Sequence, residues 1–254
     1  MSTSSSANTA EWARSWLENR HVLVTGGTGG IGGAIAGAFR DAGATVYATG
    51  ATETECEAAR ASDSSGAITY SVLDVRSNNE VTRLIDRFGD LHVVVNCAGI
   101  IRRGHERDPE VFNTVVDINL NGTMRVSEAS LDKLGATGGS IINIASMLSF
   151  FGGGLVPGYS ASKGGIAQLT KSLAIAYAAK GVRVNAIAPG WIATPLTQAL
   201  QDDPARAGPI LARTPMGRWG RPDDLRGIAL FLTSPHAAFM TGTVIPVDGG
   251  YSIS

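Results

Sequence analysis

Runs of consecutive apolar residues recur along the 254-residue chain, and they constrain its fold more than any other feature. Residues 93–95 form such a run, and residues 141–144 nearly do. Uninterrupted apolar strands are typical of a parallel sheet covered on both faces, because a strand with one face in water alternates apolar and polar residues. The runs predict strands at residues 21–25, 44–49, 67–73, 91–95, 139–145, 182–187 and 243–247.

Stretches with helical periodicity separate these strands. They predict helices at residues 30–42, 53–61, 78–88, 109–134, 158–180, 196–212 and 222–233. Strands that alternate with helices form right-handed crossovers and a doubly wound sheet. We therefore expect an α/β fold over residues 21–254: one Rossmann-type domain with a parallel sheet of about seven strands and helices on both faces.

The composition excludes several classes of protein. Hydrophobic residues make up 44% of the chain and charged residues 17%, so a sizeable core can be buried. The net charge is −1 without a long basic block, which argues against a nucleic-acid surface. Two distant cysteines and four scattered histidines offer no metal-ligand spacing, and so few cysteines suit a reducing compartment. We expect neither a metal nor a nucleic-acid partner.

Residues 1–20 are expected to form an N-terminal tail and a short helix. Residues 1–10 are rich in Ser, Thr and Ala and lack the basic start and apolar run of a secretory signal. Residues 11–20 place Trp12, Trp16 and Leu17 on one helix side, which indicates either packing on the chain's own domain or a subunit contact. No segment reaches the ~18–20 apolar residues that span a bilayer. We expect no membrane association and a cytoplasmic location.

A glycine-rich turn follows the first predicted strand and opens a helix. Gly26, Gly30 and Gly32 lie in this turn. Glycine lets the backbone turn tightly and approach a ligand, and the N–H groups of the helix N-terminus favour an anion. Glycine-rich turns without ligands are also common. The position after a strand nevertheless favours a site for the pyrophosphate of a dinucleotide.

Tyr159 and Lys163 lie four residues apart, on one face of the predicted helix 158–180. Such a pair is commonly a solvated helix face. A lysine cation beside a phenol also favours the phenolate, so we expect Lys163 to lower the pKa of Tyr159 toward neutral. Ser146 follows an apolar strand thirteen residues upstream of Tyr159 and offers a second hydroxyl.

Taken together, these motifs resemble the short-chain dehydrogenase/reductase family over residues 21–250. Within that family the chain is similar to the 2-deoxy-D-gluconate 3-dehydrogenase and gluconate 5-dehydrogenase subgroup. The matching motifs are residues 25–32, Asp74-Val75, residues 96–99, Asn119, Ser146, Tyr159 with Lys163, Pro189-Gly190, Thr194 and residues 248–250.

The resemblance implies a dinucleotide-binding catalytic domain and a role for each motif. Tyr159 is the general acid or base, Lys163 assists it, Ser146 donates to the substrate oxygen, and Asn119 kinks its helix and holds a water near the lysine. Backbone at Ile192 and the Thr194 hydroxyl hold the nicotinamide carboxamide, and Asp74 binds the adenine amino group. The implied cofactor contacts are Gly26, Thr28, Gly30, Ile31, Gly32, Asp74, Val75, Asn96, Ala98, Gly99, Tyr159, Lys163, Pro189, Gly190, Ile192 and Thr194.

The choice between NAD and NADP depends on the end of the second strand. An acid there binds the ribose 2′-hydroxyl, and an arginine binds a 2′-phosphate. Gly50, Ala51 and Gly29 supply neither charge, so NAD(H) is favoured and NADP(H) remains possible. Arg60 or Arg76, folding in from elsewhere, would reverse this preference.

The expected activity is hydride transfer between a nicotinamide cofactor and the carbinol or carbonyl carbon of a small hydroxy or keto compound. Arg102 and Arg103 suit the carboxylate of a sugar acid, and Met147 and Trp191 are further substrate candidates. One alternative is a carbonyl or 3-oxoacyl (β-ketoester) reductase for a more hydrophobic ketone. Another is a dinucleotide-binding sensor without catalysis. The resemblance also implies a homotetramer.

Overall fold

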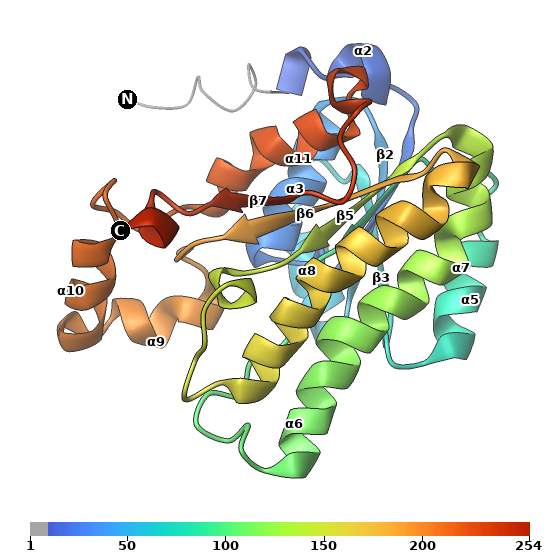
Figure 1. The fold of residues 1–254 in the computed structure, drawn as a ribbon. Helices are drawn as coiled ribbons and strands as arrows, with labels where there is room; N and C mark the ends of the chain where they lie inside the picture. The colour runs from blue at the N-terminus through green and yellow to red at the C-terminus, as the bar shows by residue number, and fades with distance from the viewer. Residues whose placement is uncertain (1–9) are drawn as a thin grey trace.

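The computed structural model describes residues 10–254; the first nine residues lie outside it. Its centre is one seven-stranded parallel sheet with the order β3-β2-β1-β4-β5-β6-β7 (Figure 1). This confirms the predicted fold class, and the predicted strands agree with the observed ones to within about two residues at each end. The strands are β1 His21–Thr25, β2 Thr45–Gly50, β3 Ile68–Val72, β4 Val93–Asn96, β5 Ser140–Ile144, β6 Arg183–Pro189 and β7 Val244–Val247.

Helices cover both faces of the sheet, with α3 and α11 on one face and α5, α7 and α8 on the other (Figure 1). The helices are α2 Arg14–Leu17, α3 Gly30–Asp41, α4 Glu53–Ser62, α5 Asn78–Asp86, α6 Pro109–Val116, α7 Gly122–Thr137, α8 Pro157–Tyr177, α9 Gln198–Gln201, α10 Pro204–Arg213 and α11 Arg226–Thr233. Successive side chains of a strand point to opposite faces, so each central strand contributes to both core layers. Val24 packs with α3 and α11, and Leu23 packs in the layer that contains α7 and α8.

Two predicted helices are not uniform α-helices. The helix predicted at 109–134 is one continuous helical run, in which a π-helical turn at Asp117–Asn121 joins α6 to α7. The prediction of one helix at 196–212 was wrong: α9 and α10 are separate. Pro204 lacks the N–H needed to continue α9, and the Asp203 side chain instead caps α10 by accepting from the Ala205 N–H at 3.0 Å.

The N-terminal helix is a single turn that packs on the rest of the chain. Leu17 and Ala13 are buried in the same core cluster as α3 and α11. The Trp16 ring meets the edge of His236, with 6.0 Å between ring centroids. These contacts support packing of the segment on the chain's own domain over a subunit contact. The domain boundary expected at residue 20 stays a prediction. Within residues 10–254, no helix has the length and apolar character needed to cross a membrane.

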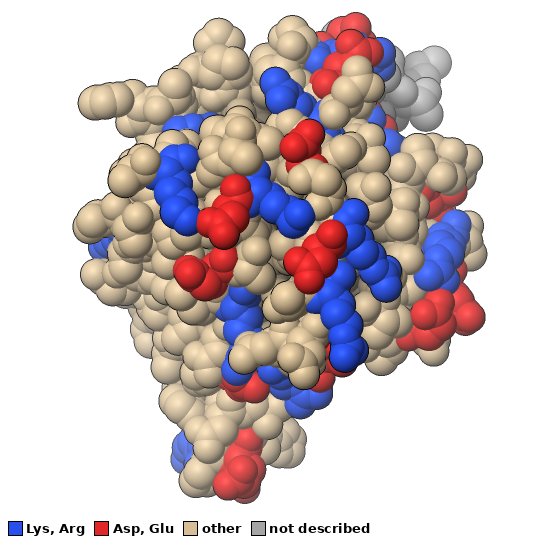
Figure 2. Space-filling view, turned by 90° about the vertical axis from the view of Figure 1, so that its right-hand side faces the viewer, with Lys and Arg blue, Asp and Glu red and all other residues tan. Residues whose placement is uncertain are grey.

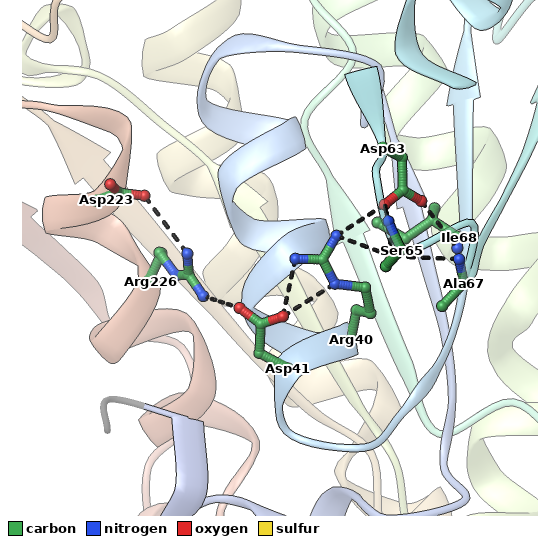
Figure 3. A network of polar contacts seen from close by, with 8 residues as sticks. All are labelled: Arg40, Asp41, Asp63, Ser65, Ala67, Ile68, Asp223 and Arg226. Carbon is green, nitrogen blue, oxygen red and sulfur yellow. Dashed lines mark hydrogen bonds and ion pairs between the residues drawn. The ribbon is translucent and has the colours of Figure 1, made fainter. Parts of the chain in front are cut away.

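A chain of ion pairs ties α3 to two other parts of the fold (Figure 3). Arg40 lies between Asp41 and Asp63, with N–O distances of 2.8 and 3.0 Å, and Asp41 also pairs with Arg226 of α11. Elsewhere, basic and acidic side chains are interspersed on the face seen in Figure 2, in keeping with the net charge of −1. The ion-pair chain is therefore a local link between α3, α11 and the loop before β3.

Candidate active site

The predicted site residues converge at the carboxyl edge of the sheet. In open parallel sheets this edge is where ligands bind. Strands β1, β4, β5 and β6 end there at Thr25, Asn96, Ile144 and Pro189, and each is followed by one of the motifs identified in the sequence. The glycine turn after β1 faces the loop after β4 on one side and Thr194 on the other.

The glycine turn is packed so closely that side chains are excluded. A Cβ on Gly26 would lie 2.8 Å from the Ala98 backbone, and Gly26 has a φ of +64°. A Cβ on Gly32 would lie 2.1 Å from the Gly26 carbonyl oxygen. The turn leads into α3, whose twelve residues start at Gly30 and present free N–H groups and a favourable dipole at this end. This cradle fits the pyrophosphate of a dinucleotide.

The remaining cofactor candidates lie along the same crevice. Thr194 lies against Gly30, with its methyl group 3.6 Å from where a Gly30 Cβ would be, and Ile192 is buried beside it. A Cβ on Gly190 would lie 2.6 Å from the Asp248 Cα, so the turn after β6 also requires glycine. The structure thus brings the turns after β1 and β6 together, as the dinucleotide hypothesis requires.

Two polar candidates, Asp74 and Asn96, already have partners within the protein. Asp74 makes a two-pronged pair with Arg76, with hydrogen bonds of 2.9 and 2.7 Å, and this pairing lowers the pKa of the carboxyl group. The Asn96 amide donates to Ser127 and to the Asn143 side chain in the core. Because the Asn96 side chain is buried in the core, any cofactor contact at residue 96 would come from its backbone. Next to Asp74, Val75 is buried against Gly122.

The catalytic candidates surround the first turns of α8. Lys163 lies with its Nζ 5.5 Å from the centre of the Tyr159 ring and donates to the Ile144 carbonyl oxygen at 2.6 Å. The Ser146 hydroxyl accepts from the Leu148 N–H at 3.1 Å. Ser149, which the sequence did not single out, donates to the Lys163 carbonyl oxygen at 2.6 Å. These bonds fix the end of β5 against α8.

Burial sets the pKa values of the two titratable groups in this cluster. Desolvation raises the pKa of Tyr159 to about 12, although its interaction with the Ser146 hydroxyl acts in the opposite direction. Desolvation also lowers the pKa of Lys163 to about 8. The expected lowering of the Tyr159 pKa by Lys163 is therefore outweighed by desolvation of the phenol. The lysine ammonium lies over the ring and is bound to Ile144, so it does not offset the desolvation of the phenol.

Asn119 lies in the π-helical turn and is 1% exposed. Its side chain accepts from the Ile100 N–H at 2.8 Å, donates to the Ile100 carbonyl oxygen at 2.9 Å, and donates to Ser162 at 3.1 Å. A π turn inside an α-helix commonly marks a functional site. Here it brings Asn119 between the loop after β4 and helix α8, which agrees with the predicted kink.

The four substrate candidates have different surroundings. Arg102 and Arg103 are exposed on the loop after β4, at the same edge as Tyr159. Trp191 packs edge-on against Trp219 and Tyr251 and borders a hollow of about 240 Å³. Met147 is 5% exposed and belongs to a core cluster, so it lines no open surface and its packing role is structural.

Two carboxylates near the site were missed in the sequence. Glu55 of α4 folds back to the end of β2 and accepts from the Ala51 N–H at 2.7 Å. Glu106 is 1% exposed and accepts from the Tyr159 N–H at 2.7 Å. Glu55 lies in the first turn of a helix, which is an ordinary place for an acid. For Glu106, the sequence offered one indication of a role in the site: an acidic residue in a loop expected at the carboxyl edge of the sheet.

Comparisons with known proteins agree with this geometry. A family model described as enoyl-(acyl carrier protein) reductase matches residues 26–252. The 2-dehydro-3-deoxy-D-gluconate 5-dehydrogenase of Bacillus subtilis (strain 168) is 41% identical over 243 residues, which cover 92% of this chain and 95% of the relative. A 3-oxoacyl-(acyl-carrier-protein) reductase of Thermotoga maritima is 33% identical over 249 residues, which cover 93% of this chain and 99% of the relative.

Solved structures show the same likeness. The gluconate 5-dehydrogenase from Burkholderia cenocepacia J2315, in complex with NADP and tartrate, has a TM-score of 0.87 and 35% identity, and the match covers 93% of this chain and 96% of that chain. The family model's range, residues 26–252, includes the glycine turn and the catalytic candidates. The chain is therefore an oxidoreductase of the short-chain dehydrogenase/reductase family.

Proposed function

We propose that the protein oxidises a hydroxyl group, or reduces the corresponding carbonyl group, of a small sugar acid with a nicotinamide cofactor. The observation that carries this proposal is the convergence of Ser146, Tyr159 and Lys163 on the crevice between the turns after β1 and β6. A dinucleotide-binding sensor needs the glycine crevice but has no need of a half-buried proton donor beside it.

The protein's own residues would bind the cofactor and move the proton. The glycine turn and the N-terminus of α3 would hold the pyrophosphate, and Lys163 would hold the nicotinamide ribose. The nicotinamide ring, when bound, supplies the hydride chemistry. Tyr159 would then protonate the carbonyl oxygen during reduction and remove the hydroxyl proton during oxidation. Ser146 would donate a hydrogen bond to the same oxygen and stabilise the charge that develops there.

The substrate class is inferred from the arginines of the loop after β4. Arg102 and Arg103 are exposed there, and neither forms an ion pair within residues 10–254. A guanidinium binds a carboxylate with two parallel hydrogen bonds, which suits a sugar acid. The Bacillus subtilis relative, named for a sugar-acid substrate, is also more similar than the 3-oxoacyl reductase, at 41% against 33% identity. A hydrophobic ketone is therefore the second choice.

For the cofactor we propose a preference for NAD(H) over NADP(H), and Glu55 gives it a physical basis. The Glu55 Oε2 lies 3.0 Å from where a Gly50 Cβ would be, at the end of β2. A carboxylate at this position would accept from a ribose 2′-hydroxyl and repel a 2′-phosphate. The two arginines considered as phosphate partners are occupied: Arg60 pairs with Glu53, and Arg76 pairs with Asp74.

A homotetramer is the proposed assembly. Large apolar side chains are exposed on α8 and near the C-terminus: Ile175 is 81% exposed and Ile253 is 88% exposed. Burial of such residues against a second copy is favourable, and closed symmetric assemblies are the common outcome. Sedimentation at micromolar concentration tests this assembly, and a lone species of the 26.3 kDa chain mass would contradict it.

The activity is tested with one substrate panel. Purified protein is assayed with NADH and NADPH against keto-sugar acids, β-ketoesters and aryl ketones, with uncharged keto sugars of equal size as controls. We expect the highest kcat/KM for a keto-sugar acid. Faster turnover of β-ketoesters would favour the second choice, and binding of NADH without turnover of any compound would favour the sensor.

A further inference from the structure

Glu106 is a buried carboxylate that the mechanism above does not use. It belongs to the loop between β4 and α6 and is 1% exposed, whereas Arg102 and Arg103 in the same loop are exposed. A buried carboxylate is unfavourable unless hydrogen bonds satisfy its oxygens. Each oxygen of Glu106 accepts a 2.7 Å hydrogen bond from a backbone N–H, one from Arg102 and the other from Tyr159. The two partners are a substrate candidate and the proposed proton donor.

The bond to Tyr159 replaces a missing helix cap. The first N–H groups of a helix have no partner within it, and the residue before the helix usually supplies one with a side-chain oxygen. In α8 that residue is Val156, whose side chain has no oxygen. Glu106 instead reaches the helix from fifty-three residues earlier in the chain and binds the N–H of the third helical residue. Its negative charge at a helix N-terminus is also electrostatically favourable.

Two further features fit this connection. A Cβ on Gly158 would lie 3.3 Å from the Glu106 Oε2, so the glycine at this position leaves room for the carboxylate. The Gly104 N–H donates to the Leu155 carbonyl oxygen at 2.8 Å, which joins the same loop to the chain just before α8. The loop before α6 and the start of α8 therefore lie side by side, as Figure 1 also shows.

We propose that Glu106 is a positioning residue that couples the arginine loop to Tyr159. With one oxygen it fixes the backbone at Arg102, and with the other it fixes the backbone at Tyr159. An anionic substrate held by the loop would then arrive at a fixed distance from the phenol. A misplacement of about 1 Å at a reacting group can lower the rate roughly a hundredfold. Loss of the link through Glu106 should therefore lower kcat measurably. The inference rests on the proposed function in assigning the substrate carboxylate to the arginines and proton transfer to Tyr159.

The charge of Glu106 also acts on Tyr159. Four groups surround the phenol: Ser146 from the end of β5, Cys97 from the loop after β4, Glu106 from the arginine loop, and Lys163 from α8 itself. Glu106 is one of the groups that raise the pKa of Tyr159, after desolvation and Cys97. Its removal would therefore shift the alkaline rise of alcohol oxidation toward lower pH, which loss of packing alone would not do.

The test compares Glu106→Gln and Glu106→Ala with Glu110→Gln, which removes an exposed carboxylate four residues further along the chain. Hydrogen exchange, followed by mass spectrometry, reports the amides of Arg102 and Tyr159 without any substrate. Steady-state kinetics are measured with a keto-sugar acid and an uncharged keto sugar, and the pH profile is measured for oxidation. NADH affinity is measured by fluorescence.

We expect faster exchange at both amides in the two Glu106 variants and unchanged exchange in Glu110→Gln. We also expect kcat to fall at least tenfold, KM to rise more for the acid than for the uncharged sugar, and the oxidation profile to move to lower pH. NADH affinity should stay within a few-fold. Normal exchange at both amides with normal kinetics would overturn the proposal. Suppose instead that both amides exchange faster but KM changes equally for the sugar acid and the uncharged sugar. Glu106 would then not couple the arginine loop to Tyr159, and the proposal would also be overturned.

The test remains decisive if a variant fails to fold or if no sugar acid is turned over. If Glu106→Gln fails to fold, Gly158→Ala displaces the carboxylate more mildly and is subjected to the same measurements. If no sugar acid is turned over, the proposed function fails. The exchange data and the pH profile with whichever alcohol is oxidised still decide whether Glu106 joins the loop to Tyr159.

Discussion

The Lys163 ammonium lies over the Tyr159 ring, with Nζ 5.5 Å from the ring centre, and donates to the Ile144 carbonyl oxygen at 2.6 Å. The lysine is thus held by the end of β5 and not by the phenol oxygen. As a result, desolvation governs both groups: it raises the pKa of Tyr159 to about 12 and lowers the pKa of Lys163 to about 8.

A direct consequence concerns pH. Tyr159 must lose its proton to act as a base in oxidation and must keep it to act as an acid in reduction. Because its pKa is raised to about 12, the phenolate fraction grows about tenfold per pH unit throughout the alkaline range. We expect alcohol oxidation to accelerate from neutral to alkaline pH, while carbonyl reduction stays nearly constant around neutral. Initial rates in both directions across the same buffers measure this, and an oxidation rate that is flat with pH would contradict it.

The second prediction removes the phenol oxygen. Tyr159→Phe keeps the ring that lies beneath Lys163 and deletes only the proposed acid–base group. Turnover should fall by about a hundredfold or more, the loss expected for a positioned acid–base group, while NADH affinity changes by no more than a few-fold. Tyr70→Phe, which also removes a phenol but lies in β3 at the edge of the sheet, is the control. Near-normal turnover in Tyr159→Phe would refute the assignment.

Sequence patterns predicted the fold and the motifs that gather at the carboxyl edge of the sheet, because both depend on local signals. The apolar runs give the strands, and the spacing of Gly26, Gly30 and Gly32 gives a turn that the structure shows to exclude side chains. Tyr159 and Lys163 share a helix face because of their spacing. Their pKa values could not be predicted in this way, because desolvation depends on everything that packs around them.

Contacts between distant residues were beyond sequence reasoning. Glu106 and Tyr159 are fifty-three residues apart, and nothing in a loop acid indicates that it caps a later helix. A kink at Asn119 was expected, but its hydrogen bonds to Ile100 across the fold were not. Glu55 was overlooked because the acid was sought within β2 itself, whereas α4 returns it to that strand's end.

The third prediction concerns the ion-pair chain in Figure 3. Hydrogen bonds from Ser65 are the largest cause that lowers the pKa of Asp63, followed by the Ile68 N–H and Arg40, and they act against the desolvation of the carboxyl. A carboxyl with a lowered folded-state pKa stabilises the fold above its unfolded pKa of 3.8, and this contribution is lost as the pH falls through the folded value.

Asp63→Asn should therefore lower the free energy of unfolding by about 2 kcal/mol at neutral pH, the scale of a lost hydrogen bond to a charged group. The difference from the parent should shrink below pH 3.8. Urea unfolding at a series of pH values measures both effects. Asp86→Asn, at an exposed carboxyl of α5, should be nearly neutral. A pH-independent difference would show that the charge of Asp63 is not the cause.

The last prediction concerns cofactor choice, where Glu55 revises the argument from the sequence. Gly50, Ala51 and Gly29 supply no carboxylate near the adenosine 2′ position, so on their own they leave NADP(H) possible. Glu55 supplies a carboxylate at the end of β2, where it accepts from the Ala51 N–H at 2.7 Å, and we propose that it faces the 2′ position. The revised expectation is a clear preference for NADH, and Glu55→Gln should reduce the NADH-to-NADPH ratio of kcat/KM by about tenfold, the equivalent of about 1.4 kcal/mol.

The same geometry selects the variants that make this test clean. Aspartate at Gly50 is unsuitable, because its Cβ would lie 2.8 Å from the Thr28 methyl and 3.0 Å from the Glu55 carboxylate. Arginine at Ala51, which is exposed, should shift the preference further toward NADPH when combined with Glu55→Gln. Glu57→Gln removes an exposed carboxylate of the same helix and should leave the ratio unchanged. The measurement is kcat/KM for both cofactors in the parent and all variants. If the parent uses NADPH tenfold better, or if Glu55→Gln and Glu57→Gln behave alike, Glu55 does not read the 2′ position.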